Sequence, residues 1–563
     1  MGSKRQSAPK MDAATARAAD GARWERWAFG TLLGLQLVPL WAFTFVPTQD
    51  GPAHLENAAI LLRRSTVAVI GQFYLPNPQL VPNWLGHGLL VPLLALFSPA
   101  LAEKLALSGY VLALPLAFRH LLTPPARARG FALCIFPFLF GYTFYMGFTS
   151  FCWSLVFFFV ALSIWFRSRG RLGPARLAGL GLASLAVALG HPVTLVALLI
   201  TLGSLSSGRV LVDLARAQGS GRRARVLRYH GRLWASLAVA LLPAAALVVA
   251  FSAGGAEGYG LQWLPLGRRL SGLAVLLSLV AVTPADLWVS AALAASIVVA
   301  VGTTAWARRH SVSASWEWLF AAGVTLLVAL AAPDQFGRGW GMTLRLQFFP
   351  FALALLWVGL GRPLPGLART LPAACSLASL ALLGLRLPAH ARLSHALEEY
   401  TSVAPHVPRG SVILPLQLTL GRDLDRDGLF PLNFSPLLHA AGYVAASRDS
   451  VDLANYEANT GLFPVRYRPE RNPYLRLARG LGFEGEGSFP CVDLASGSDL
   501  GIDHVIVWGP LEDALVDPCV RDWARELARA YDLVFVSHPR HFAELWRRKP
   551  AAPPDAARSG VDR

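Results

Sequence analysis

Long runs of hydrophobic residues, separated by short polar segments, make up most of the first two thirds of this 563-residue chain. About 20 consecutive apolar residues in a helix are enough to cross a bilayer, and many of these runs approach that length without a charged residue. The predicted spans lie at residues 27–46, 102–119, 130–146, 149–166, two within 177–206, 234–252, 286–306, 316–332, 343–360 and 369–387. The pattern therefore predicts an α-helical polytopic membrane protein with about eleven transmembrane helices.

Two further apolar stretches are too short or too broken to be counted as spans. Residues 83–97 are interrupted by glycine, histidine and proline, and residues 270–283 are short. We expect interfacial or re-entrant helices at both places, the first of them within a long outer loop over residues 47–101.

From about residue 390 the pattern changes to charged, turn-rich sequence. Strand-like runs at 411–416, 504–508 and 533–537 alternate with helix-like stretches such as 522–531. This alternation predicts a soluble α/β domain over residues 390–549. The basic segment 1–26 and the Pro/Ala-rich segment 550–563 are expected to be tails outside the folded domains.

The net charge of +17 follows from the topology rather than from a nucleic-acid site. Arginine and lysine gather in the short segments between apolar runs, above all in 209–232, which marks those segments as cytoplasmic. The resulting topology places the N-terminus in the cytoplasm and the C-terminal domain outside, in a bacterial inner membrane. No nucleic-acid partner is expected.

The five cysteines indicate no metal-binding spacing. Cys134, Cys152 and Cys375 lie in apolar runs and are expected to pack as small hydrophobic residues. Cys491 and Cys519 lie in the C-terminal domain, where a disulfide is a candidate if that domain is extracytoplasmic.

Three ionisable residues, Asp50, His54 and Glu56, follow the first apolar run directly. If Gly51-Pro52 opens a helix, Asp50 is its N-cap, and the other two lie one to two turns further along. Ionisable groups at a membrane boundary are candidates for function. The structural alternative is that Asp50 does no more than cap the helix.

The remaining unusual polar residues map to the same outer face. His191 lies at the tip of the two short spans, and Asp334, Arg338 and Arg345 lie in or beside a later outer loop. Outer arginines favour pairing with a phosphate or pyrophosphate, because a guanidinium presents a fork of donors to phosphate oxygens. The structural alternatives are a salt bridge from Arg345 to Asp334 or to a lipid headgroup, and a packing role for His191.

This arrangement resembles the GT-C superfamily of membrane glycosyltransferases, such as the protein O-mannosyltransferases and the lipid A aminoarabinose transferases. The resemblance covers residues 25–390 and is architectural. It rests on an acid after the first span, a long first outer loop with interfacial helices, many apolar spans and a basic residue in a later outer loop. The stretches DGPAH at 50–54 and RLQFFP at 345–350 carry it most directly. The chain lacks the superfamily's Asp-Glu pair after the first span.

The resemblance implies transfer of a sugar from a polyprenyl-phosphate carrier to a glycan, lipid or protein acceptor on the outer face, among membrane lipids. Asp50 would be the general base, assisted by His54. Arg345, with Arg338 and His191, would bind the lipid phosphate as it leaves. The resemblance leaves open whether the protein binds a divalent cation, Mg²⁺ or Mn²⁺. Glu56 and Asp334 are the candidate ligands for that cation, or contacts to the acceptor.

Two other classes of function remain open at this stage. A transporter or flippase would predict internal repeats and charged residues near mid-membrane, which the sequence does not show. A non-catalytic scaffold could use residues 390–549 to hold a partner or glycan. Tyr456, Glu457 and Asn459 could form a carbohydrate surface there, although a solvated loop is the favoured interpretation.

Overall fold

The computed structural model describes residues 13–123, 126–168, 172–253, 260–309, 315–336, 339–361, 363–418, 431–477, 491–495 and 497–550. These residues form two compact units. Unit 1 contains residues 1–42, 107–143 and 151–387, and unit 2 contains residues 43–106, 144–150 and 388–563. Residues 43–106 and the C-terminal segment, residues 388–563, therefore share a unit.

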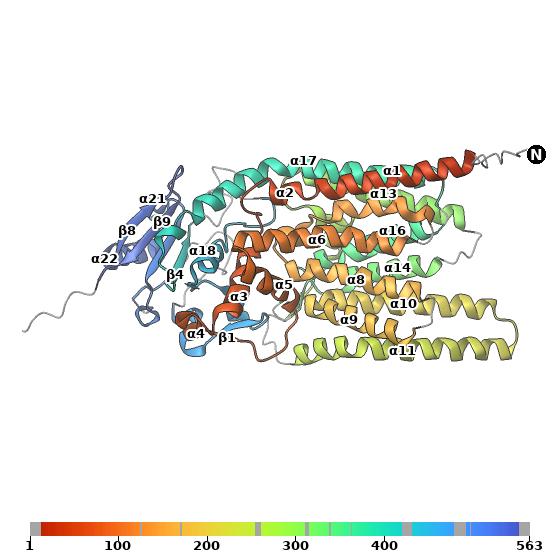
Figure 1. Cartoon of the computed structure of the whole chain (residues 1–563), viewed down its shortest axis with the longest axis horizontal. Helices are drawn as coiled ribbons and strands as arrows, with labels where there is room; N and C mark the ends of the chain where they lie inside the picture. Colours follow the sequence, from red (N-terminus) through yellow and green to blue (C-terminus); the bar gives the residue numbers. More distant parts are fainter. Residues whose placement is uncertain are drawn as a thin grey trace, which may run out of the picture. The chain divides into compact units, whose positions relative to one another are not determined.

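Unit 1 is built from helices, several of them long and apolar. The helices that lie wholly or mainly in it are α1 (Ala13–Leu35), α2 (Val38–Trp41), α6 (Pro99–Leu122), the 3-10 helix η1 (Ala126–Phe138), α8 (Thr149–Arg167), α9 (Pro174–Gly190), α10 (Pro192–Arg216), α11 (Ser220–Ala253), α12 (Leu266–Ala274), α13 (Ala285–Arg308), α14 (Trp316–Ala331), α15 (Met342–Leu346), α16 (Phe348–Leu360) and α17 (Leu367–Thr401) (Figure 1). Two short strands, β2 (Leu261–Gln262) and β3 (Gln335–Phe336), pair antiparallel.

Among the described residues, seven helical segments are long and apolar enough to cross a membrane, and four shorter apolar helices accompany them. The predicted fold class, an α-helical polytopic membrane protein with a C-terminal α/β domain, is confirmed.

Two predicted spans differ from the structure. The run 27–46 is not one helix, because α1 ends at Leu35 and α2 follows with Pro39 in its first turn. Proline has no N–H for the bond to the carbonyl four residues earlier. The run 130–146 is likewise not a continuous α-helix. Its first part is η1, which contains Pro137, and a short helix α7 (Tyr142–Tyr145) follows.

The predicted break at His191 is confirmed. Helix α9 ends at Gly190, α10 begins at Pro192, and His191 between them is extended, with φ −163° and ψ 135°. A residue before proline avoids the helical region, and proline suits the first position of a helix.

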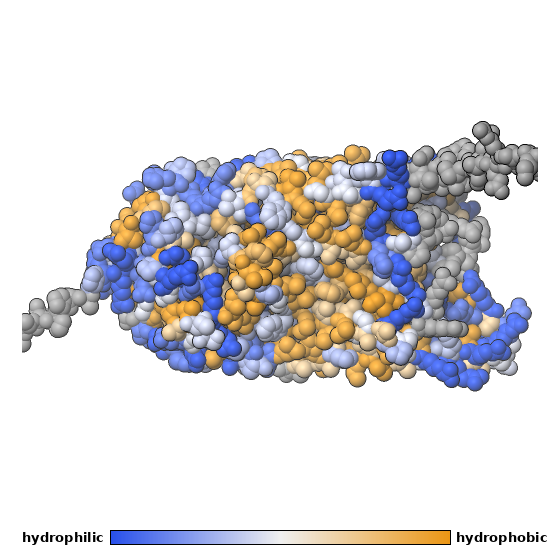
Figure 2. Space-filling view, viewed as in Figure 1, coloured by the Kyte–Doolittle hydropathy of each residue, from blue (hydrophilic) through white to orange (hydrophobic). Residues whose placement is uncertain are grey.

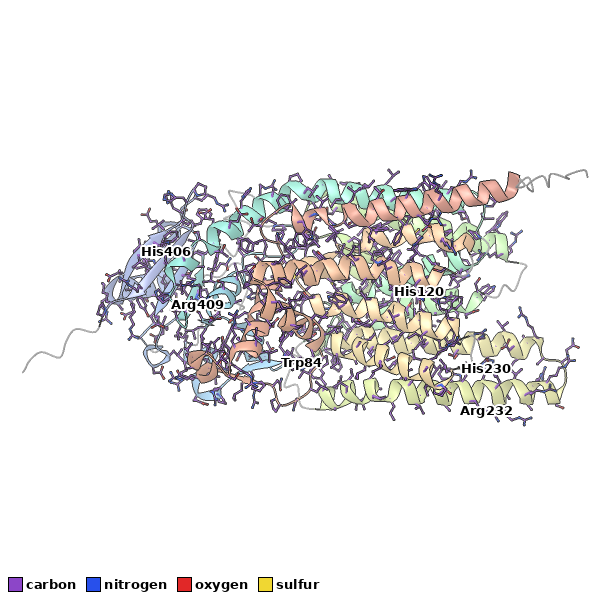
Figure 3. The ribbon with its side chains drawn as sticks, in the orientation of Figure 1. Trp84, His120, His230, Arg232, His406 and Arg409 are labelled. Carbon is purple, nitrogen blue, oxygen red and sulfur yellow. A yellow bond between two sulfur atoms is a disulfide. The ribbon has the colours of Figure 1, made fainter. Side chains whose placement is uncertain are left out.

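Helix α11 divides along its length into a basic and an apolar part. Its first turns carry exposed arginines, among them Arg228 and Arg232, whereas its later turns expose Val239 and Leu242. Figure 2 shows this change from hydrophilic to hydrophobic surface along the α10–α11 hairpin. At the basic end, His230 Nε2 lies 2.9 Å from Asp213 Oδ2 and ties α11 to α10 (Figure 3).

A buried ion pair joins α13 and α17 within unit 1. Arg386 Nη2 lies 3.0 Å from Asp286 Oδ2, and both side chains are almost fully buried. Asp286 also accepts hydrogen bonds from the backbone N–H groups of Ala281 and Val282, and Arg386 Nη1 donates to the carbonyl of Phe140. This network fixes the turn that precedes α13.

Unit 2 combines residues 43–106 with the C-terminal segment. Residues 43–106 include α3 (Gly51–Arg63), α4 (Ala68–Phe73), β1 (Tyr74–Pro76) and α5 (Trp84–Leu96). Strand β1 pairs antiparallel with β6 (Val465–Tyr467) of the C-terminal segment. The stretch 83–97 forms the expected helix, α5, which begins at Trp84 (Figure 3); its place at the membrane interface stays a prediction.

The C-terminal segment contains a five-stranded sheet in the order β5-β4-β7-β9-β8. Strands β4 (Val412–Gln417), β5 (Val451–Asp452) and β7 (His504–Trp508) are parallel, and β9 (Ala543–Arg548) pairs antiparallel with β7 and with β8 (Tyr531–Val536). The strands expected from the sequence at 411–416, 504–508 and 533–537 correspond to β4, β7 and β8. The helices of this segment are α18 (Ala441–Arg448), α19 (Tyr456–Thr460), α20 (Pro473–Arg476), α21 (Leu511–Ala514) and α22 (Pro518–Ala530).

Both faces of this sheet are buried. Leu414 and Val505 belong to a hydrophobic cluster that includes Trp523 of α22. Ile413 and Ile506 belong to a second cluster, which includes apolar residues of α3 and α5. Alternate residues of a strand point to opposite faces, so the sheet supports α3 and α5 from one side. Cys491 and Cys519 form a disulfide with a Cα–Cα distance of 5.4 Å.

Candidate functional site

Asp50 stands at the N-cap position of α3, as the Gly51-Pro52 sequence predicts. Its side chain makes no capping hydrogen bond, and the residue is only 5% exposed. A buried carboxylate is costly unless other groups compensate it. This geometry therefore argues against the structural alternative, in which the Asp50 side chain only caps the helix.

The segment containing Gly147 holds the start of α3 in place. The backbone N–H of Gln49 donates to the carbonyl of Tyr145 at 2.9 Å, and that of Asp50 donates to the carbonyl of Met146 at 3.0 Å. Gly147 has φ +80°, and a Cβ there would lie 2.5 Å from the backbone nitrogen of Gly51. Only glycine combines this left-handed backbone with so close an approach.

Polar side chains surround the Asp50 carboxylate. Gln49 Nε2 donates to Asp50 Oδ1 at 3.2 Å, and His439 Nε2 lies 3.7 Å from the same oxygen. The Tyr456 hydroxyl also bonds to Asp50, and its ring stacks on His439 with a centroid distance of 4.5 Å. Burial raises the pKa of Asp50 to about 6, against the opposing effect of His54. Burial lowers the pKa of His439 to about 3, so its ring is neutral near pH 7.

One turn after Asp50, His54 meets a buried carboxylate from the C-terminal segment. His54 Nδ1 lies 2.7 Å from Glu457 Oε1, and His87 Nε2 on α5 lies 3.4 Å from Glu457 Oε2. The two imidazole rings are edge-to-face at 5.0 Å. His87 and Glu457 are fully buried, and His54 is 5% exposed.

Neighbouring amides hold Glu457 in this position. Asn57 Nδ2 donates to Glu457 Oε2, and Asn455 Nδ2 donates to Asn57 Oδ1 at 2.9 Å. Burial alone would raise the pKa of Glu457, but the two histidines lower it to about 2. Burial would lower the pKa of His54, but the Glu457 carboxylate outweighs burial and raises it.

Glu56 lies on α3 close to these groups but bonds to others. The Tyr74 hydroxyl lies 3.4 Å from Glu56 Oε1 and 3.0 Å from the carbonyl of Asp452. Burial, and then the charge of Asp452, raise the pKa of Glu56 well above its ordinary value. Its role as an acceptor contact or metal ligand stays a prediction.

Among known proteins, solved structures show a likeness to this chain, whereas sequence comparisons do not. No protein-family model matches the chain, and no curated protein matches its sequence. The structure is similar to the crystal structure of ArnT from Cupriavidus metallidurans in the apo state, with a TM-score of 0.46 and 13% sequence identity over 94% of this chain and 98% of that one.

The other candidates from the sequence lie in unit 1. Arg345 is 7% exposed on α15, and its Nη1 donates to the carbonyl of Trp340. Asp334 accepts a hydrogen bond from the backbone N–H of Thr343 at 3.0 Å and so stabilises the start of α15. Arg338 lies outside the described residues, as do residues 1–12 and 551–563 of the expected tails.

His191 has a defined local role at the start of α10. Its Nδ1 accepts a hydrogen bond from the backbone N–H of Val193 at 3.2 Å, and its ring packs edge-to-face on Phe151. A phosphate-binding role for His191 or Arg345 stays a prediction.

Sequence reasoning missed two of the residues near Asp50 and placed a third wrongly. A solvated loop was favoured for the region of Glu457, and this is wrong, because Glu457 is fully buried against two histidines. His87 and His439 carry no sequence signal, since each is a single histidine in an otherwise apolar stretch. Only tertiary packing brings them to the start of α3.

The arrangement offers two kinds of chemistry. The Asp50 carboxylate, not used for capping, can accept a proton from a bound hydroxyl group. His54, His87 and Glu457 present ligand atoms that all lie within 4.8 Å of one another, a group that could hold a metal ion.

Proposed function

We propose that the protein is a membrane glycosyltransferase that transfers a sugar from a polyprenyl-phosphate carrier to an acceptor hydroxyl on the extracytoplasmic face. The observation that carries the proposal is Asp50, a buried carboxylate at the N-cap of α3 that makes no capping bond. It directly follows the first apolar run, where the resemblance to GT-C transferases places the catalytic acid.

In this mechanism Asp50 takes the proton of the acceptor hydroxyl as its oxygen attacks the anomeric carbon. The bond between that carbon and the phosphate oxygen breaks, and polyprenyl phosphate leaves with the electron pair. The sugar is attached with inverted configuration. Gln49, Tyr456 and His439 keep the carboxylate oriented through their contacts with it.

Arg345 is the proposed partner for the leaving phosphate. Negative charge grows on the phosphate oxygens as the bond breaks, and a fixed guanidinium stabilises that charge more in the transition state than in the ground state. The bond from Arg345 to the Trp340 carbonyl restrains the side chain before a donor binds. Arg338 and His191 are proposed as helpers in this role.

The proposal is tested with Asp50→Asn, which keeps the size of the side chain and removes the base. In cells that normally make the protein, envelope glycans and lipids are compared by mass spectrometry among wild type, a deletion strain and the variant. We expect the product missing from the deletion strain to fall at least about 100-fold in the variant, with membrane abundance unchanged. Asp522→Asn, at an exposed position on α22, is the matched control and keeps the product. A full yield from Asp50→Asn would contradict the proposal.

A further inference from the structure

Three polar side chains from three separate elements converge beside α3. His54 comes from α3, His87 from α5 and Glu457 from α19, and their ligand atoms all lie within 4.8 Å of one another. All three residues are buried. A buried group of two imidazoles and a carboxylate is one of the ligand sets that proteins use for zinc.

The hydrogen bonding of His87 determines which of its ring nitrogens carries the hydrogen. Nδ1 lies 2.8 Å from the carbonyl of Asn83, which can only accept, so Nδ1 is the donor. In the neutral ring, Nε2 then presents a lone pair toward Glu457 Oε2, which lies 3.4 Å away and also has only lone pairs to offer. Two such groups repel unless a positive charge lies between them.

His54 is held in a similar way. Its ring hydrogen-bonds to the backbone of Gly147, and its Nδ1 faces Glu457 Oε1 at 2.7 Å. Metal-bound histidines nearly always donate their second ring N–H to a carbonyl or carboxylate, which fixes the orientation of the ring. Both histidines have a backbone partner of this kind, one in the segment before α8 and one at the start of α5.

We infer that His54, His87 and Glu457 bind a divalent transition-metal ion of the Zn²⁺ class. Imidazole nitrogen favours Zn²⁺ and its neighbours over Mg²⁺ and Ca²⁺, which prefer oxygen ligands throughout. Ligands about 2.1 Å from a tetrahedral ion lie roughly 3.4 Å from one another. The 3.4 Å between His87 Nε2 and Glu457 Oε2 matches this separation, whereas the 2.7 Å between His54 Nδ1 and Glu457 Oε1 is shorter and has to lengthen when an ion binds.

The amides around Glu457 suit a metal-binding carboxylate. Asn57 bonds to Glu457 Oε2, and Asn455 bonds both to Asn57 and to the backbone N–H of Ala458 at the start of α19. Such outer contacts orient metal ligands and strengthen binding. The chain therefore supplies three ligands with their supporting bonds, and a fourth position stays open for water or another group.

A bound ion would join α3, α5 and α19 one helical turn from Asp50. It would hold the helix that carries the proposed general base, and so act as a positioning element. The inference rests on contacts within unit 2 and not on the proposed transfer reaction. It would stand if that reaction proved wrong.

The test measures metal directly. The full-length protein, purified in detergent with a streptavidin-binding tag so that no polyhistidine adds metal sites, is analysed by inductively coupled plasma mass spectrometry. We expect about one zinc per chain in wild type and at least about 10-fold less in Glu457→Gln and His87→Asn. Glu103→Gln, which removes a different buried acid, one on α6 whose carboxylate accepts a hydrogen bond from the Tyr443 hydroxyl, is the matched control and keeps the metal.

A second measurement needs no variant, in case the ligand variants fail to fold. Wild-type protein stripped with a chelator is titrated with Co²⁺, and we expect the intense visible absorption bands of a tetrahedral site at one equivalent. Bands that fail to appear in the stripped wild type would overturn the inference, as would equal metal in wild type and in folded ligand variants. In either case His54 and Glu457 would form a proton-bridged ion pair.

Discussion

His54 Nδ1 lies 2.7 Å from Glu457 Oε1, although the two residues lie about 400 positions apart in the sequence. This contact places a C-terminal carboxylate beside the helix that Asp50 begins. The C-terminal segment is therefore part of the candidate site, because Glu457, His439 and Tyr456 all surround the start of α3.

Gly147→Ala should disturb the start of α3. The added methyl group meets the backbone nitrogen of Gly51, and alanine must adopt a positive φ, so we expect a loss of about 1–3 kcal/mol in stability and a loss of transfer activity. Gly88→Ala on α5 is the control, because nothing lies near its added Cβ. That variant should be neutral or more stable by about 0.5–1 kcal/mol. Thermal unfolding in detergent measures both, and equal behaviour of the two variants would refute the role assigned to Gly147.

Removing only one partner of the ion pair between Asp286 and Arg386 should lower the free energy of unfolding. Arg386→Met leaves the Asp286 carboxylate buried without its cation, and we expect a loss of about 3–5 kcal/mol. Adding Asp286→Leu should recover part of that loss, because no uncompensated charge remains. A double variant as unstable as the sum of the single changes would show that the two residues act independently.

Arg345→Gln tests the phosphate-binding role in unit 1. Removing a cation aimed at the departing phosphate should lower transfer by about 100-fold or more, while protein abundance is retained. Arg345→Lys should recover only part of the activity, since lysine lacks the planar fork of donors. Arg268→Gln, at an exposed position on α12, is the matched control. Unchanged product in Arg345→Gln cells would exclude Arg345 from the reaction.

His504 on β7 should make stability depend on pH. It is buried, and neither ring nitrogen has a hydrogen-bond partner among the described residues. Burial lowers its pKa below the ordinary value of 6.5. The unfolded chain therefore takes up a proton that the folded chain resists, and stability is lost as the pH falls below 6.5.

His504→Leu should remove this loss. The melting temperature of the variant should fall less than that of wild type between about pH 7.5 and about pH 5.5. His395→Gln, at an exposed position, should follow the wild-type curve. Parallel curves for wild type and His504→Leu would show that His504 does not cause the acid sensitivity.

The sequence predicted local features well and distant contacts poorly. The start of α3 follows from Gly51-Pro52, and the break at His191 follows from Pro192, because proline acts on its immediate neighbours. The strands β4 and β7 follow from short apolar runs. The division of the 27–46 run after Leu35 has a local signal too, because Pro39 disfavours a helix through the preceding turn.

The candidate site was predicted only in part, for a physical reason. Asp50 and His54 are marked by their position after an apolar run, a signal present in the sequence. Glu457 lies in a short polar segment that looks solvated, and its burial depends on α3 and α5 packing over it. No local pattern encodes that packing, and hydrogen bonds such as Asn57 to Glu457 appear only once the fold is known.

The most direct test of the central claim is a cryo-electron microscopy map of the purified protein with polyprenyl phosphate added. We predict density for the lipid phosphate against the Arg345 guanidinium. Phosphate density at any other place, with none against Arg345, would contradict the glycosyltransferase mechanism.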